Sequence, residues 1–113
     1  NIIWEKTFGG TNFDSSRSII KLENGNYLIS GNSSSTDLDL TSNNGSNDAW
    51  TFIIDENGNL QFEINVGGSN IDFAIGAVET LDNKIIVVGY TGSNDQDITL
   101  NKGGNDILIY KIK

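Results

Sequence analysis

Short apolar runs alternate with polar clusters along the whole chain. In the first half, these runs cover Ser15–Leu22, Tyr27–Asn32, Ala49–Asp55 and Leu60–Val66. Each run has the length of a β-strand, and the runs are too short and too evenly spaced for a helical protein. The clusters between them are rich in Asn, Asp, Ser and Gly, which is typical of turns. The pattern predicts an all-β protein.

Two of the connections between runs contain an Asn-Gly dipeptide. Asn24-Gly25 joins the first two runs, and Asn57-Gly58 joins the last two. Both residue types tolerate the positive φ angles of tight hairpin turns, whose twist matches that of the flanking strands. We therefore expect two antiparallel hairpins at these positions.

The chain also repeats itself. Aligning it with itself at an offset of about 58 residues gives an ungapped match from Ile2 to the end, with about a quarter of the positions identical. The identical pairs are mostly polar residues and glycines: Glu5/Glu63, Gly9/Gly67, Gly10/Gly68, Asn12/Asn70, Asp14/Asp72, Gly31/Gly89, Asp37/Asp95, Asp39/Asp97, Thr41/Thr99, Asn43/Asn101, Gly45/Gly103, Asn47/Asn105 and Asp48/Asp106. We expect a first repeat over residues 1–58 and a second over 59–113.

Antiparallel sheets of four strands that recur every 40 to 60 residues or so are typical of β-propeller blades, which pack face to face around an axis. The run Ile85–Val88 is apolar throughout, whereas a strand with one wet face would alternate apolar and polar residues. Burial on both faces explains such a run. The sequence predicts two four-stranded antiparallel propeller blades.

Three segments carry a resemblance to a known family: Trp4–Asp14, Glu23–Gly31 and Asn47–Trp50. They resemble the bacterial SBBP-type β-propeller repeat, in which a strand ends in Gly-Gly-x-x-x-Asp, an Asp-Gly or Asn-Gly turn follows, a strand ends in Gly, and another begins with Asp-Ala-aromatic. The resemblance covers both repeats, and it implies a secreted or cell-surface bacterial protein.

The chain departs from the family pattern in its loops. The long loop of the family often contains Phe-Pro-Thr, but this chain has no Pro, and Asp37–Thr41 lies there instead. In the second repeat, Ile107-Leu108 replaces Ala49-Trp50, and Asp82-Asn83 replaces Asn24-Gly25.

We label the four runs of the repeat a (Ser15–Leu22), b (Tyr27–Asn32), c (Ala49–Asp55) and d (Leu60–Val66). The order along the chain is then d-abc-d-abc, and Ile2–Phe8 is an outer strand d without the inner strands of its own blade. By the order that the resemblance implies, Ser15–Leu22 and Phe73–Thr80 lie nearest the propeller axis. The second blade lacks a final outer strand, and Ile2–Phe8 belongs to a neighbouring blade. If each open blade face exposed roughly 500 Å² of apolar surface to water, the protein would lose about 12 kcal/mol of hydrophobic stabilisation per face. A whole domain has a net stability of only about 5–15 kcal/mol.

We therefore expect the ring to be closed by other blades. These are either missing repeats of a longer chain or copies of the same chain in a cyclic homo-oligomer, such as a trimer of about six blades. The oligomer is the arrangement that we favour for this chain.

The amino-acid composition argues against several classes of function. The formal charge is −8, and the seven basic residues form no stripe that could bind nucleic acid or an anionic membrane. No apolar run is long enough to span a bilayer, so no membrane insertion is expected. The chain has no Cys or His, and its carboxylates show no asymmetry that would single out a catalytic acid. We expect no enzyme; a glycoside hydrolase with two carboxylates is the remote alternative.

In such blades, the d–a and b–c loops emerge at one rim, where binding sites commonly lie. The function expected from the fold is a scaffold, adhesion or interaction module that binds other blades and a surface protein or glycan. The alternative is a lectin, with Phe13 exposed to stack on a sugar ring. The candidate ligand-rim residues are Asn12, Phe13, Asp14, Asn43, Asn47, Asn70, Asp72, Asn101 and Asn105.

A calcium ion in each repeat is the sharpest chemical hypothesis, because Ca²⁺ takes six to eight oxygen ligands from flexible loops. The candidate ligands are Asp37, Asp39, Thr41 and Asp48, with Asp95, Asp97, Thr99 and Asp106 in the second repeat. The alternative, which we favour, is that side-chain oxygens such as those of Asp14 and Asp48 accept hydrogen bonds from backbone N–H groups in turns.

Overall fold

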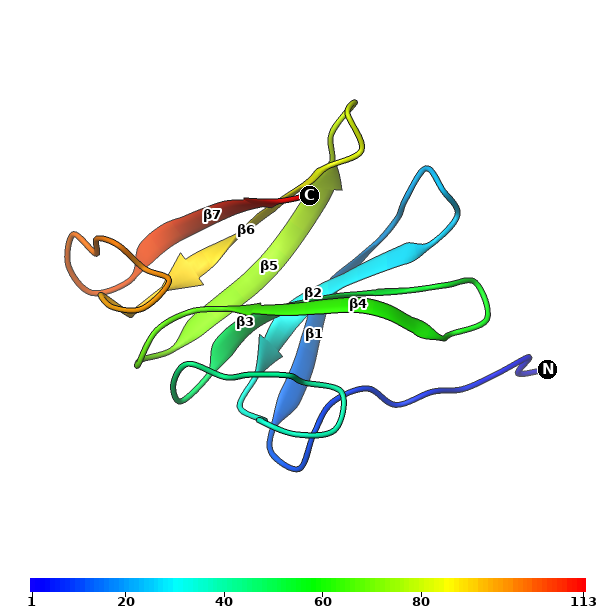
Figure 1. Ribbon diagram of the computed structural model, residues 1–113, viewed down its shortest axis with the longest axis horizontal. Coiled ribbons are helices and arrows are strands. Elements are labelled where there is room, and N and C mark those ends of the chain that lie inside the picture. Colours follow the sequence, from blue (N-terminus) through cyan, green and yellow to red (C-terminus); the bar gives the residue numbers. More distant parts are fainter.

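The computed structural model covers residues 1–113 and contains two antiparallel β-sheets and no helix (Figure 1). The first sheet has the order β1-β2-β3-β4, with bounds Asp14–Lys21, Tyr27–Ser33, Asp48–Ile54 and Leu60–Val66. The second has the order β5-β6-β7, with bounds Asp72–Glu79, Ile85–Thr91 and Asp106–Ile112. The predicted all-β class is confirmed, and no helix is present that could cross a membrane.

The hairpin turns follow from the residues at their tips. Gly25 and Gly58 have positive φ angles of 93° and 79°, as the Asn-Gly dipeptides predict. In the second repeat, Asn83 takes the place of Gly25 and still adopts a φ of 59°. Asn tolerates this left-handed region better than most residues with a Cβ, so the turn survives the substitution.

The two sheets share one backbone irregularity. The β1–β2 register shifts between Ser16 and Ser18, and the β5–β6 register shifts between Ala74 and Gly76, at the same position of the repeat. A bulge of this kind bends the strand and increases its twist. The sequence repeat is therefore also a repeat of local backbone shape.

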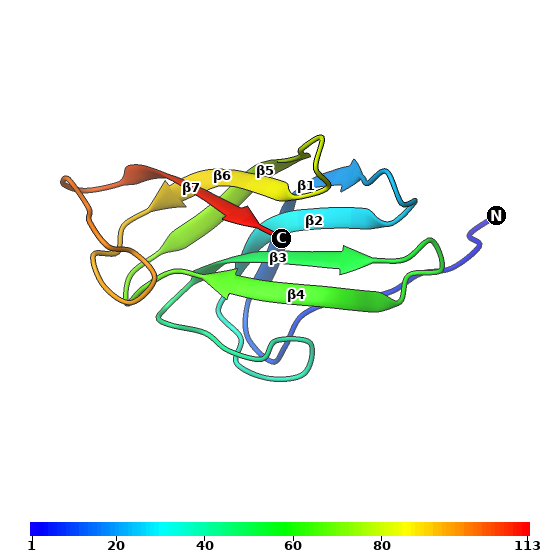
Figure 2. The same ribbon diagram turned by 45° about the horizontal axis from the view of Figure 1, so that its top comes forward.

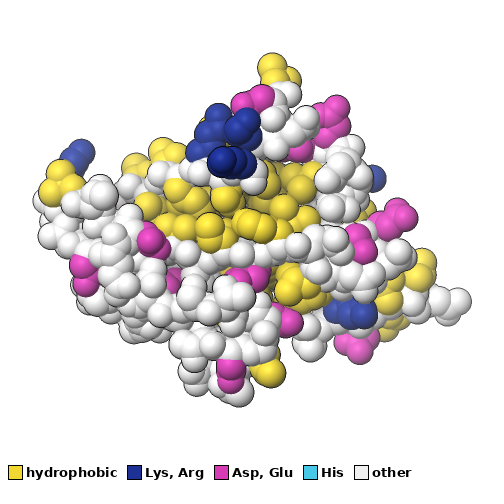
Figure 3. Space-filling view, viewed as in Figure 1, with side chains coloured by type: hydrophobic (Ala, Val, Ile, Leu, Met, Phe, Trp, Pro, Cys, Tyr) yellow, Lys and Arg dark blue, Asp and Glu magenta, His cyan; other side chains and the backbone are white.

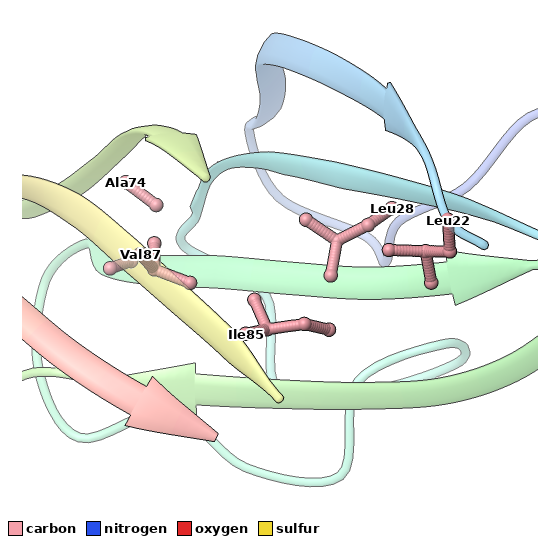
Figure 4. Close-up of a cluster of buried hydrophobic side chains, with 6 residues drawn as sticks. Leu22, Leu28, Ala74, Ile85 and Val87 are labelled. Atoms are coloured by element: carbon pink, nitrogen blue, oxygen red, sulfur yellow. The ribbon is translucent and has the colours of Figure 1, made fainter. Parts of the chain in front are cut away.

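The core lies between the two sheets. Its buried side chains come from both: Leu22, Leu28 and Ala49 from the first sheet, and Ala74, Ile85 and Val87 from the second. Figure 4 shows the labelled members of this cluster pointing toward one another across the gap between the ribbons. The hydroxyl groups of Thr51 and Tyr110 lie 3.1 Å apart and join the sheets by a hydrogen bond.

The sheets pack unlike faces together. Each sheet has two faces, and equivalent faces carry equivalent residues of the repeat. The front face is defined by Ile29, Trp50, Phe52 and Ile54 in the first sheet and by their equivalents Val87, Leu108, Tyr110 and Ile112 in the second. The opposite face of each sheet is its back. The front of the second sheet packs on the back of the first. The front of the first sheet and the back of the second therefore lie at the two ends of the stack.

The segment Ile2–Phe8, which we expected to be an outer strand, is not part of either sheet. The reason is geometric, because β4 already occupies the outer edge of β3. The segment instead lies against the front of the first sheet, where the ring centroids of Phe8 and Phe52 are 5.1 Å apart. Trp4 donates from Nε1 to the carbonyl oxygen of Glu56 at 3.2 Å.

We expected Ile85–Val88 to be buried on both faces of the strand, but within the chain only one face is buried. Ile85 and Val87 are buried against the first sheet, whereas Val88, on the back of the second sheet, is 42% exposed. Nothing within the chain covers that back face.

The connections between strands lie at two opposite ends of the sheets. Figure 2 shows the β1–β2 and β3–β4 turns at one end and the long β2–β3 and β6–β7 loops at the other. The short turns before β1 and β5 bind these long loops. This second end is the loop end, which carries the candidate site residues.

Candidate functional site

At the loop end, Asp14 holds together the turn before β1 and the loop after β2. Its carboxylate accepts hydrogen bonds from the backbone N–H of Gly10 at 2.9 Å and from the hydroxyl of Ser35 at 3.2 Å. The hydroxyl of Ser33 donates to the other carboxylate oxygen at 2.5 Å. This carboxylate satisfies donors that the local backbone cannot pair.

The second repeat builds the same network around Asp72, which is fully buried. Its carboxylate accepts from Gly68 N–H and from the Ser93 hydroxyl, both at 2.9 Å, and from the hydroxyl of Thr91. The hydroxyl residues were not among the predicted site residues. Ser93 matches Ser35 in the repeat alignment, and this identity was the signal that could have found the pair.

The carboxylates predicted as calcium ligands also bind backbone. Asp37 accepts from Thr11 N–H and Asp39 from Gly9 N–H, each at 2.9 Å. Their equivalents bind in the same way, Asp95 to Ser69 N–H at 2.8 Å and Asp97 to Gly67 N–H at 3.2 Å. The hydrogen bond from the Ser69 backbone is the main reason that the pKa of Asp95 lies below its ordinary value.

A further duplicated motif closes the long loops. Asn43 donates from Nδ2 to the Ser33 carbonyl at 3.0 Å and accepts from Gly45 N–H at 2.9 Å. Asn101 makes the equivalent bonds to Thr91 at 3.3 Å and Gly103 at 2.7 Å. The identical Asn residues thus hold equivalent loop conformations.

The structure does not bring the predicted calcium ligands together. The hydroxyl of Thr41 donates to Glu63 at 2.5 Å, so it turns to β4 rather than to the carboxylates of Asp37 and Asp39. No group of three or more acidic side chains has the arrangement of a metal site. The calcium hypothesis has no preformed ligand set in this arrangement of the loops.

Asp48 is the one predicted site residue in an unfavourable electrostatic environment. Its side chain is fully buried, and one of its carboxylate oxygens has no hydrogen-bond partner. Burial raises the pKa of Asp48 to about 6, with smaller upward contributions from Asp72 and Asp97, against the lowering effect of a hydrogen bond from Asn44 N–H. A buried carboxylate of this kind favours its neutral form.

Asn44 joins the loop of the first sheet to the turn that leads into the second. Its Nδ2 donates to the Gly67 carbonyl at 3.2 Å and to the Asp97 carboxylate at 2.7 Å, and its backbone carbonyl oxygen accepts from Gln96 Nε2 at 2.6 Å. Gly45 lies so close that a Cβ there would be 2.0 Å from the carbonyl oxygen of Gly68. Polar contacts at the rim therefore fix how one sheet sits on the next.

The front of the first sheet contains a groove of about 280 Å³. Phe8, Ile29, Trp50 and Phe52 contribute its apolar wall, and Asp14 contributes to its polar end. In the second sheet, the equivalents of Ile29, Trp50 and Phe52 pack against the first sheet. The groove therefore coincides with a sheet-packing surface.

Glu63 has a structural role that the sequence did not suggest. From β4 it accepts hydrogen bonds from Thr41 N–H at 3.2 Å and from Trp50 Nε1 at 3.1 Å, so it ties the outer strand to the long loop and to β3. Its repeat equivalent, Glu5, is exposed and makes no hydrogen bond. The identity of the two residues was visible in the alignment, but its meaning depends on the β4 contact.

The rim residues do gather at the loop end, where their polar atoms bind within the chain. Asn12 donates from Nδ2 to the Ser34 carbonyl at 3.2 Å, and Asn47 accepts from Asn32 Nδ2 at 3.2 Å. Asn70 repeats the first of these bonds. Phe13 differs from them, because its side chain is 66% exposed beside the rim.

Fold and networks together define an all-β protein that repeats one antiparallel sheet and one loop framework. No protein-family model matches the chain, and no curated protein is significantly similar to it.

Proposed function

We propose that the chain is a non-enzymatic β-propeller segment of the SBBP type, whose two blades stack with further blades to form a binding or adhesion scaffold. One observation carries the proposal: the two sheets pack front to back, which leaves the back of the second sheet uncovered and an apolar groove on the front of the first. Contacts between unlike faces continue from unit to unit until a ring closes.

The uncovered back of the second sheet supports this function. It exposes large apolar side chains on all three strands, among them Val78 at 56%, Ile107 at 78% and Ile109 at 64%. Contiguous apolar surface of this kind on a soluble protein marks an interaction site. The back of the first sheet, which is covered, holds Leu28 and Ala49 in fully buried positions.

The blades that complete the ring come from copies of the same chain or from further repeats of a longer one. We favour copies of the same chain, in a cyclic homo-oligomer such as a trimer. The resemblance to SBBP-type repeats supports a location outside the bacterial cell, as a secreted or surface protein. Its partners there are a surface protein or a glycan.

Sedimentation velocity and light scattering of the chain at micromolar concentration test the proposal. The expected mass is a multiple of the 12.3 kDa chain, and a trimer has about 37 kDa. A well-folded monomer under these conditions would contradict the proposed assembly.

Glycan binding is a second candidate, favoured by the 66% exposed ring of Phe13 beside Asn12 at the rim. An exposed aromatic ring can stack on a sugar while amides bind its hydroxyl groups. A glycan-array screen with and without Ca²⁺ tests this function and its metal dependence. Silence in both conditions would count against a lectin, and an unchanged melting temperature with a chelator would count against structural calcium.

A further inference from the structure

The outer edge of β7 opens into the largest groove of the molecule. The groove has a volume of about 610 Å³ and lies between β7 and the loop that precedes it, with Thr99, Leu108 and Tyr110 among its lining residues. Figure 3 shows hydrophobic side chains gathered between β7 and β4. In the first sheet, the equivalent edge of β3 is occupied by β4.

The pairing of β3 with β4 in the first sheet indicates what kind of strand the equivalent edge of β7 can bind. β4 runs antiparallel to β3, with Ala49 opposite Val66, Thr51 opposite Ile64 and Ile53 opposite Phe62.

Glu63 adds side-chain contacts to the backbone ladder through its hydrogen bonds from Thr41 and Trp50. Asn65, also on β4, donates from Nδ2 to the Ser42 carbonyl. The strand is thus bound by the edge of β3 and by the preceding loop together.

The repeat supplies a matching strand, the segment Ile2–Phe8, which aligns with β4. Glu5 takes the place of Glu63, and Thr99, in the wall of the open groove, takes the place of Thr41. Within one chain they lie far apart, because the N-terminal segment extends on the opposite side of the first sheet from β7 (Figures 1 and 2).

We propose that Ile2–Phe8 of a second chain adds to the edge of β7 as the fourth strand of the second sheet. The register follows from that of β3 and β4: Ile107 lies opposite Phe8, Ile109 opposite Lys6, and Lys111 opposite Trp4. The Glu5 carboxylate accepts hydrogen bonds from the backbone N–H and hydroxyl of Thr99. This inference rests on the proposed assembly of blades and specifies the contact that joins two chains.

In the proposed contact, both Ile2–Phe8 and the first sheet of the second chain bind the second sheet of the first chain. Phe8 already packs on Phe52 at the front of its own first sheet, with ring centroids 5.1 Å apart. When the segment pairs with β7, that front face meets the exposed back of the second sheet, which carries Val88 and Ile109. One contact between chains therefore covers the open edge of β7, the exposed back of the second sheet and the groove on the front of the first.

Cysteine cross-linking tests the register, because the natural chain contains no Cys. Residues directly opposite in antiparallel strands have Cα atoms about 4.5–5.5 Å apart, within disulfide range. Under mild oxidation, the double variant Lys6→Cys/Ile109→Cys should form covalent dimers and larger ladders. The control, Lys6→Cys/Ile107→Cys, places the second thiol on the same face but two residues out of register, and it should cross-link at least tenfold more slowly.

The outcomes separate this inference from the proposed function. A chain that assembles but cross-links equally in both variants, or in neither, would overturn the strand pairing and leave the assembly standing. A folded chain that stays monomeric would overturn both.

A second pair of variants checks the side-chain contact without a disulfide. Removing a charge-assisted hydrogen bond costs about 1.5–3 kcal/mol, so Glu5→Ala should weaken association by about tenfold or more. The control is Glu56→Ala, because the exposed Glu56 carboxylate makes no hydrogen bond. Equal association constants for the two variants would contradict the Glu5–Thr99 contact, and unchanged circular dichroism spectra would show that both chains remain folded.

Discussion

The carboxylates of the loop end act mainly on the backbone of their own chain. Asp14 and Asp72 each satisfy one backbone N–H group and two hydroxyl groups, and this explains why both repeats keep an Asp there. Asp48 is different, because it lies at the junction between the sheets with one oxygen unpaired. A buried charge without a full set of partners lowers the stability of the fold.

Stability should therefore depend on pH through Asp48. Its folded-state pKa of about 6 lies above the ordinary value of 3.8, so the folded protein binds this proton more tightly than the unfolded chain does. The resulting stabilisation is full below pH 3.8 and is lost as the pH rises through about 6. Asp48→Asn, which cannot ionise, should gain stability relative to wild type between pH 4.5 and 7.5, by roughly 3 kcal/mol at most.

Urea denaturation of both proteins at these two pH values measures the effect. Asp106→Asn is the matched control, because Asp106 accepts the same turn hydrogen bond, from Lys102 N–H, and no further sheet of the same chain packs beside it. A stability difference between Asp48→Asn and wild type that is the same at both pH values would refute the electrostatic explanation.

Among the elements, those with a local residue signal were the predictable ones. Strand length, the Asn-Gly turns and the repeat all depend on neighbouring residues, and the strands of the first repeat lie within about a residue of their predicted bounds. The bulge in β1 and β5 leaves no such signal, since Ser16-Arg17-Ser18 and Ala74-Ile75-Gly76 share no residue type at equivalent positions. Ile2–Phe8 was expected as a strand because it matches Leu60–Val66 in the repeat, yet a strand also needs an edge to pair with.

The candidate site was predictable in its location but not in its bonding. The repeat indicated which polar residues recur, and the expected blade arrangement predicted that they share one rim. Whether an Asp binds a metal or its own backbone depends on three-dimensional distances that residue spacing does not contain. The Thr41–Glu63 contact, which joins a loop to a strand 22 residues later, is an example.

Gly89, a buried residue within β6, should be irreplaceable. A Cβ on Gly89 would lie 1.7 Å from the backbone oxygen of Phe73, so β5 and β6 would have to move apart. We expect Gly89→Ala to lower the free energy of unfolding by about 3 kcal/mol or more.

Gly76 is the matched control, because a Cβ there meets nothing within 4 Å and its φ angle is not positive. Gly76→Ala should be neutral or should stabilise the protein by about 0.4–1 kcal/mol, since Ala restricts the unfolded chain. Chemical denaturation at one fixed protein concentration compares the two variants. Equal midpoints would show that the strands adapt and that the close approach is not needed.

At the scale of the whole molecule, the two outer faces of the sheet stack differ in chemistry. The front end carries Trp50 and Phe52 beneath the N-terminal segment, and the back end exposes aliphatic side chains of β5, β6 and β7. Inside the chain, the front of the second sheet packs on the back of the first, and these are the repeat equivalents of the two end surfaces. The interface expected between chains is therefore the interface already present within one.

A single charge on the back face should prevent this contact. Val88 lies on the central strand of the second sheet and is 42% exposed, so Val88→Lys puts an ammonium group on the surface without disturbing the core between the sheets. Burying an unpaired ammonium group costs several kcal/mol, so association should weaken by more than about a hundredfold. Leu81→Lys is the control, because Leu81 is fully exposed in the β5–β6 turn, away from both faces. Light scattering should find folded monomers for Val88→Lys and assembled protein for Leu81→Lys; if Val88→Lys assembles like wild type, the back face is not the contact surface.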